Sequence, residues 1–221
     1  MQMHTEWLTW QLADSAFPSG GFAHSSGLEA AWQNGEVVDG AGLERFVREA
    51  VEQAGRSGLP FVTAVHAAPD RLAAIDDIAD AFLTNAVANR ASRVQGRSFV
   101  STCARIWPQP PLQALELQAR SLRGHYAPLV GAAGRALSVP ADVIQRLFLF
   151  QIVRGILAAA VRLGIVGAYE AQRRQSDCAD FLGAVHARCR CLDERHLTQT
   201  APLLDILQSA HDRLYSRLFQ S

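Results

Sequence analysis

A long apolar segment in the second half of the chain sets the strongest constraint on the fold. From Pro140 to about Leu163, hydrophobic residues occur on every side of a predicted helix, and the proline stands at its first turn. Such a helix has no polar face for water, so other elements must enclose it. Polar side chains interrupt the segment, among them Arg146, Gln151, Arg154 and Arg162. We therefore expect a central core helix, not a membrane span.

The rest of the chain also repeats its apolar residues at helical spacing. Residues 43–54 form the clearest stripe, with Asp39 placed to cap the helix that carries it. No segment alternates as a strand does, and we find no linker or repeat. The sequence predicts an all-α, single-domain bundle of about ten helices spanning residues 1–221, with the long apolar helix (about 140–163) at its centre. The last helix is expected from Pro202 to Phe219.

Composition and charge exclude several classes of protein. The chain has 21 arginines, no lysine and 21 acidic residues, so its formal net charge is zero. A strongly basic nucleic-acid binder is not indicated. Acidic and polar residues interrupt any apolar signal segment near the start, and four cysteines in such a chain are typical of reduced thiols. We expect a cytoplasmic protein with no membrane contact and no nucleic-acid partner.

Residues 12–32 combine a helix stop, a turn and a helix start. Pro18 disfavours helix before it, and Gly20 and Gly21 permit a left-handed backbone. Phe22, like Phe17 on the other side of the glycines, is expected to pack inward and hold the turn against the bundle.

The next helix is predicted to begin with a capping box. Ser26 stands three residues before Glu29, the spacing of reciprocal side-chain caps. In that arrangement Glu29 is an exposed charge at the helix start. It is therefore a candidate contact for a partner.

The sequence gives little support to a catalytic or phosphate-binding function for this turn. A P-loop needs a Lys-Ser/Thr pair after its glycines and a strand before them, and both are missing. His24 and Ser25 suggest a hydrolase, but no nucleophile elbow accompanies them. We expect no catalytic residues and no cofactor.

Metal binding is the main alternative function. The region from Cys178 to His196 also holds His186, Cys189 and Cys191. Cysteines two apart on one helix point about 200° from each other, and no Cys-x-x-Cys pair is present. Structural thiols are favoured over a metal site, although a helical metal-binding or metal-sensing protein remains the alternative.

Two further groups of residues suggest protein contacts. Arg90, Arg93 and Arg97 share one helix face, and Arg154 and Arg162 lie on the long helix. Such arginines form a solvated surface, a contact for an acidic protein partner or a site for a bound phosphate. Tyr215, Arg217 and Phe219 lie within the last seven residues, where a chain end commonly frays. Tyr, Arg and Phe are enriched at protein interfaces, so we favour an interface there.

Several segments, in order along nearly the whole chain, together resemble the UreF family of urease accessory proteins. The N-terminal signature is Pro18, Gly20, Gly21, Phe22, Ser25, Gly27, Leu28 and Glu29. The middle of the chain contributes residues 93–97 and 124–131, and the long helix contributes residues 158–164 with Gly167 and Gln172. The end of the chain contributes residues 201–206 and His211, Leu214, Tyr215, Arg217, Leu218, Phe219 and Ser221. Residues 176–200 show no resemblance.

This resemblance implies an all-α, non-enzymatic chaperone of nickel insertion into urease. Its partners would be UreD (also called UreH), the GTPase UreG and apo-urease, with the chain acting as a homodimer. The tail, with Tyr215, Arg217 and Phe219, would dock on UreD. The segment around Arg162 would contribute to the surface that regulates UreG, with Glu29, Arg93 and Arg97 as further candidate contacts.

Overall fold

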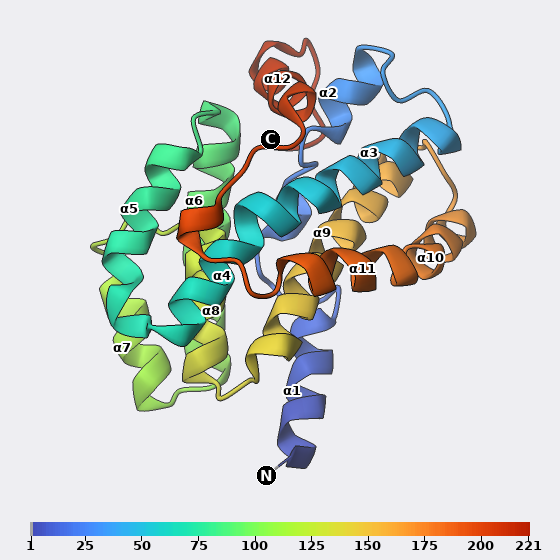
Figure 1. Cartoon of the computed structure of the whole chain (residues 1–221). Helices are drawn as coiled ribbons and strands as arrows, with labels where there is room; N and C mark the ends of the chain where they lie inside the picture. The colour runs from blue at the N-terminus through green and yellow to red at the C-terminus, as the bar shows by residue number, and fades with distance from the viewer. Residues whose placement is uncertain (1) are drawn as a thin grey trace.

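The computed structural model describes residues 2–221, with side chains from residue 5 onward. Helices cover most of this part of the chain, and it contains no strand (Figure 1). The α-helices are α1 (Gln2–Ala13), α2 (Leu28–Gln33), α3 (Gly40–Gln53), α4 (Leu59–Ala67), α5 (Leu72–Phe82), α6 (Ala86–Ile106), α7 (Pro110–Ala119), α8 (Tyr126–Ala136), α9 (Ala141–Arg162), α10 (Ala168–Asp177), α11 (Ala179–Cys189) and α12 (Pro202–Ala210). The predicted all-α class is confirmed.

Helix α9 is the centre of the bundle, as its apolar composition predicts. It contacts α1, α2, α3, α4, α8, α10 and α11. Among the described residues it is the one helix long and apolar enough to span a membrane. Its large side chains, such as Ile144, Leu149 and Ile156, instead lie fully buried in the protein core. The contacts of α9 explain its hydropathy without a bilayer.

Helices α3 and α4 form one nearly continuous rod. Asp39 caps α3 as expected, because its carboxylate accepts a hydrogen bond of 2.7 Å from the Gly42 amide. A π-helical turn, Ala54–Gly58, joins the two helices where the sequence suggests a break before Pro60. A Cβ at Gly58 would lie 2.7 Å from the Phe148 ring of α9. The π-helical turn therefore places small residues where neighbouring side chains approach closely.

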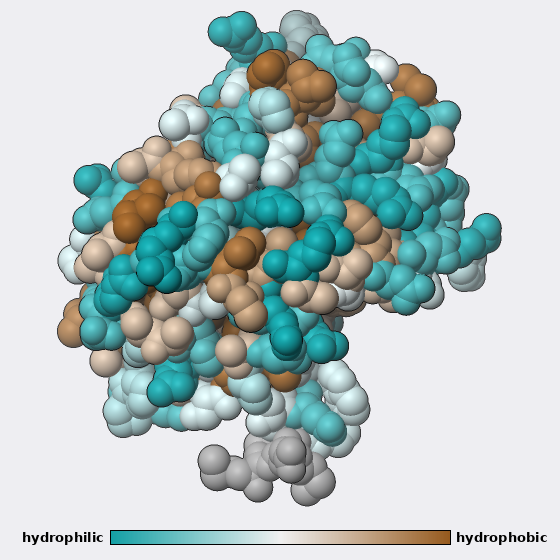
Figure 2. Space-filling view, viewed as in Figure 1, coloured by the Kyte–Doolittle hydropathy of each residue, from teal (hydrophilic) through white to brown (hydrophobic). Residues whose placement is uncertain are grey.

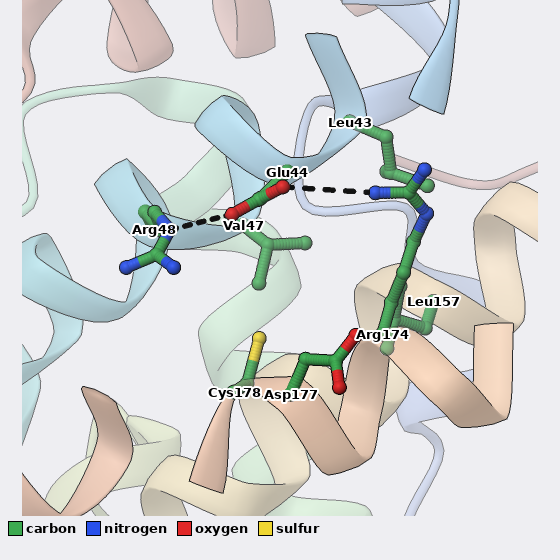
Figure 3. Close-up of a pocket in the computed structure, with 8 residues that line it drawn as sticks. All are labelled: Leu43, Glu44, Val47, Arg48, Leu157, Arg174, Asp177 and Cys178. Atoms are coloured by element: carbon green, nitrogen blue, oxygen red, sulfur yellow. Dashed lines mark hydrogen bonds and ion pairs between the residues drawn. The ribbon is translucent and has the colours of Figure 1, made fainter. Parts of the chain in front are cut away.

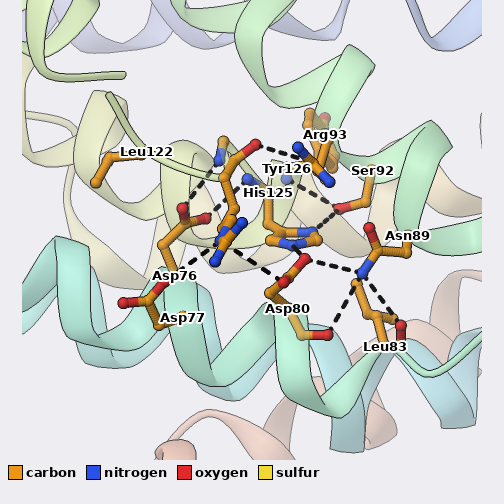
Figure 4. A network of polar contacts seen from close by, with 12 residues as sticks. Asp76, Asp77, Asp80, Leu83, Asn89, Ser92, Arg93, Leu122, His125 and Tyr126 are labelled. Atoms are coloured by element: carbon orange, nitrogen blue, oxygen red, sulfur yellow. Dashed lines mark hydrogen bonds and ion pairs between the residues drawn. The ribbon is translucent and has the colours of Figure 1, made fainter. Parts of the chain in front are cut away.

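The turn between α7 and α8 is held by a buried carboxylate (Figure 4). Asp76 of α5 accepts hydrogen bonds from the Gly124 and His125 amides at 2.9 and 2.8 Å. The His125 ring lies between Ser92 Oγ at 3.2 Å and Asp80 Oδ1 at 3.0 Å. Asp76 is fully buried, and these donors make the burial of its carboxylate tolerable.

The end of the chain also departs from prediction. Helix α12 stops at Ala210, and a single 3-10 turn, His211–Arg213, leads into non-helical backbone. The helix expected to continue to Phe219 is therefore wrong beyond Ala210. Figure 1 shows α12 beside α2 at one end of the molecule, with α1 projecting at the opposite end.

Gly96 provides a test of the packing between α6 and α8. A Cβ at this position would lie 2.8 Å from the His125 carbonyl carbon, a backbone atom that cannot rotate away. We expect Gly96→Ala to lower the free energy of unfolding by about 1–3 kcal/mol in urea denaturation. Gly183→Ala on α11 is the control, because nothing lies within 4 Å of its added Cβ. Equal stabilities of the two variants would contradict the close approach.

Candidate functional site

The turn after α1 follows the sequence prediction in part. Gly20 adopts the left-handed conformation, with φ of +79°, whereas Gly21 does not. Phe17 is buried and stacks on Trp107, with ring centroids 5.9 Å apart. Phe22 was expected to pack inward, yet 71% of its surface is exposed. One aromatic ring therefore anchors the turn and the other is presented to solvent.

The start of α2 corrects two expectations. Gly27, with φ of +87°, is the N-cap residue, so the predicted capping box of Ser26 and Glu29 does not form. Glu29 was expected to be an exposed charge, but only 2% of its surface is accessible. Its side chain points into the protein because the last residues of the chain supply its donors.

Residues 211–221, which we call the tail, wrap around the Glu29 carboxylate. Glu29 Oε1 accepts a hydrogen bond of 2.6 Å from the Leu218 amide. Glu29 Oε2 accepts from the Phe219 amide at 3.1 Å and from His211 Nε2 at 3.0 Å. A buried carboxylate with three donors is well satisfied, whereas one without them is strongly disfavoured. Glu29 therefore fixes the path of the tail.

A second set of contacts holds the last residue of the tail against the turn. The Ser221 carbonyl oxygen accepts from the Ser25 amide at 2.6 Å and from Ser25 Oγ at 3.1 Å. His24 Nδ1 lies 2.6 Å from Ser221 Oγ, and the Gln220 amide donates to the Ala23 carbonyl at 2.8 Å. His24 and Ser25 thus bind the tail instead of each other, which leaves no support for a hydrolase at these residues.

Arg162 connects α9 to both the turn and the tail. Its guanidinium carbon lies 3.9 Å from the Phe22 ring centroid and 4.1 Å from that of Phe219. It also donates a hydrogen bond of 2.6 Å to the Phe22 carbonyl. A guanidinium this close to two aromatic rings makes favourable cation–π contacts with both. Three distant parts of the sequence meet at this side chain.

The clamped tail leaves an exposed surface made partly of apolar side chains. Figure 2 shows hydrophobic residues gathered over α12 at the top of the molecule. We call this region the tail surface, formed by the exposed residues Leu203, Ile206, Tyr215, Arg217 and Leu218. Phe219 was expected to join it but is 5% exposed and faces inward. Removal of residues 215–221 would take the Leu218 and Phe219 amides, two of its three donors, away from Glu29.

The arginine face of α6 divides into two parts. Arg90 pairs with Asp212 of the tail at 2.8 Å. Arg93 and Arg97 instead donate to the carbonyls of Arg123 and Leu122, at 3.2 and 3.1 Å, in the turn before α8. The structure therefore brings only one end of this face to the tail.

The cysteine region is dispersed over separate environments. Cys178 lines a small cavity with Glu44, Arg48 and Arg174 (Figure 3). Burial raises the pKa of the Cys178 and Cys189 thiols, whereas the Cys191 side chain is exposed. Between residues 5 and 221, no group of three or more His, Cys, Asp or Glu side chains is arranged to hold a metal ion.

The two histidines of this region have other partners. His186 Nε2 lies 3.1 Å from Gln145 Oε1. His196 Nδ1 lies 2.8 Å from Asp193 Oδ1. The geometry therefore gives no support to the metal-binding alternative.

Comparison of the sequence with known proteins identifies a family and several relatives. A family model described as UreF matches residues 37–179. The chain is 34% identical to urease accessory protein F of Oryza sativa subsp. indica over 99% of its length and 86% of the rice protein. It is 35% identical to urease accessory protein F of Arabidopsis thaliana, over 98% of this chain and 92% of that protein. Urease accessory protein UreF of Ruegeria pomeroyi is 29% identical, with 93% and 92% covered.

These matches place the chain among the urease accessory proteins. It belongs to the UreF family, and this membership supports a role in urease maturation. The resemblance seen in the sequence is confirmed.

His211 is the residue of this site that sequence reasoning did not assign. It is fully buried and contacts Glu29, which lies 182 positions earlier in the chain. A histidine near the end of an amphipathic segment carries no sign of such a distant partner. Only the unexpected burial of a charge at Glu29 could have indicated that donors must come from elsewhere.

The hydrogen bonds that hold the tail to Glu29, which we call the tail clamp, are tested by Glu29→Gln. The amide replaces one acceptor by a donor that faces other donors, so we expect the free energy of unfolding to fall by about 2–3 kcal/mol. Trypsin should also cleave after Arg213 and Arg217 faster than in the wild type. Glu36→Gln, at an exposed position in the same region, is the matched control. Unchanged cleavage and stability in Glu29→Gln would refute the clamp.

His24 makes the clamp sensitive to mild acid. Burial, followed by the neighbouring His211, lowers the pKa of His24 below its ordinary value of 6.5. The unfolded chain therefore binds a proton at a higher pH than the folded chain, and stability falls as the pH drops below about 6.5. His186 adds a loss of the same sign, because burial lowers its pKa too.

We expect His24→Gln to reduce the stability difference between about pH 7.5 and about pH 5.5, because one titrating group is removed. Urea denaturation at both pH values provides the measurement. His196→Gln, at an exposed histidine, serves as the control. The interpretation fails if His24→Gln loses as much stability on acidification as the wild type does.

Proposed function

We propose that this chain is a non-enzymatic, cytoplasmic chaperone that bridges UreD (UreH) and the GTPase UreG during GTP-dependent insertion of nickel into apo-urease. Membership of the UreF family supports the assignment to urease maturation. In this proposal nickel is the cargo of the assembly, and the chain contributes binding surfaces instead of a catalytic group.

The observation that carries the proposal is the clamped tail. A non-helical segment is held in one conformation by Glu29 and Ser25, while Tyr215, Arg217 and Leu218 face solvent. A segment already ordered before binding loses little conformational entropy when it docks. Exposed Tyr and Arg next to apolar residues are typical anchors of a protein interface. We assign the tail surface to UreD.

The arginines are assigned to UreG. Arg93 and Arg97 lie on α6, outside the tail surface, and among the described residues each guanidinium donates a single hydrogen bond. Their remaining donors are available to an acidic partner. Arg162 acts indirectly in this scheme, because its guanidinium contacts the rings of Phe22 and Phe219 and positions them. Glu29 likewise acts through the tail that it holds.

We assign the contact of a homodimer to α1. Trp7 and Trp10 are exposed and stack edge to face, with centroids 4.9 Å apart. This helix projects from the end of the molecule opposite α12 (Figure 1). Two chains joined there would leave both tail surfaces free for UreD. Size-exclusion chromatography with light scattering, on the chain alone and mixed with UreD, measures both associations.

The tail surface is tested by the double substitution Tyr215→Ala and Arg217→Ala. Both side chains are exposed, so the fold should persist while affinity for UreD falls about tenfold or more. The control is Tyr169→Ala with Arg173→Ala, the same residue types exposed on α10. Pull-down with a UreD homologue provides the readout, and circular dichroism checks folding. Wild-type binding by the tail variant would refute the assignment.

A further inference from the structure

A cavity of about 330 Å³ lies between the turn after α1 and helix α9. The turn residues Ser15–Phe22 form one wall, and α9 forms the floor through Gly155 and Ala158. Arg154 and Arg162 stand on either side of this floor along the helix. A spacing of eight residues corresponds to about 12 Å along an α-helix. The small side chains of these floor residues leave the cavity space open, since even a Cβ added at Gly155 would meet nothing within 4 Å.

The charge of the cavity is unbalanced. No aspartate or glutamate lines it among the described residues, although two arginines do. Neither Arg154 nor Arg162 forms an ion pair with any described carboxylate; each donates only to a backbone carbonyl, of Ala13 and Phe22 respectively. Both are partly buried. A half-buried cation without a counter-charge is poorly compensated, which favours an anion beside it.

The orientation of Arg162 specifies how an anion would be held. Its guanidinium carbon lies 3.9 and 4.1 Å from the ring centroids of Phe22 and Phe219. Contact with two rings leaves the N–H groups at the guanidinium edge that do not bind the Phe22 carbonyl as the donors for a ligand. Those edge donors are the ones that bind a carboxylate through two parallel hydrogen bonds. His24, Ser26 and Gln95 add further polar groups to the lining.

We propose that this cavity is a binding site for carboxylates, with Arg154 and Arg162 as its charged ligands. The carboxylate is either a free small acid or the side chain of an acidic segment of another protein, since both present the same group. None of the five residues of the tail surface lines this cavity, so the proposal does not rest on the docking of UreD. Its test uses the isolated full-length chain, so its failure would leave the proposed function untouched.

The experiment is isothermal titration of the chain with malonate, a short poly-glutamate peptide and inorganic phosphate, all at constant ionic strength. Arg154→Gln removes one charged ligand. Ala158→Leu fills the floor while both arginines remain, and its exposed position makes it compatible with folding. Arg173→Gln on α10 removes the same charge from an exposed position outside the cavity and serves as the matched control.

We expect a carboxylate to bind the wild type and Arg173→Gln with equal affinity. Its affinity for the two cavity variants should be lower by about tenfold or more. Binding of malonate with this pattern identifies free small acids as ligands. Binding of the peptide alone, with the same pattern, identifies acidic protein segments. The proposal is overturned if neither carboxylate binds, if the cavity variants bind as the wild type does, or if phosphate binds more tightly than both.

Discussion

The burial of one carboxylate, that of Glu29, governs the architecture of the candidate site. A charge with 2% exposure is tolerable only when donors surround it, and three of them come from His211, Leu218 and Phe219. The tail must therefore follow one path, and the side chains between its contacts must face solvent. Presentation of Tyr215 and Leu218 is thus a consequence of how a buried charge is satisfied.

The bundle depends on an analogous requirement for small residues. Gly96 and Gly131 lie where α8 approaches α6 and α4 too closely for a Cβ, and Gly58 lies against a ring of α9. Close backbone approach lets the polar network around Asp76 and His125 form beneath the turn before α8. Packing and hydrogen bonding support each other here. Close packing brings the donors and acceptors within hydrogen-bond distance, and the hydrogen bonds in turn hold the helices at that distance.

Sequence reasoning predicted the class of fold, the central helix and the turn at Gly20, because these depend on local periodicity and backbone preference. It could not predict that α12 ends at Ala210 or that Phe22 is exposed. The stripe continues past Ala210 in the sequence, but hydrogen bonds to Glu29 compete with helix for the same amides. Glu29 was misjudged because its partners are distant in sequence. Residues of the site that depend on such long-range pairs are invisible to local patterns.

The pairing of Glu29 with residues near the other end of the sequence also affects when the site can exist. Leu218 and Phe219 are 189 and 190 positions from their acceptor, so the clamp is among the least local contacts of the chain. During synthesis, α2 emerges from the ribosome long before the tail does. Until then Glu29 has no donors from this segment, and the tail surface is not assembled. The order of synthesis therefore sets the order of assembly: the tail surface forms only after residues 211–221 have been made, whereas α2 and its buried carboxylate exist well before them.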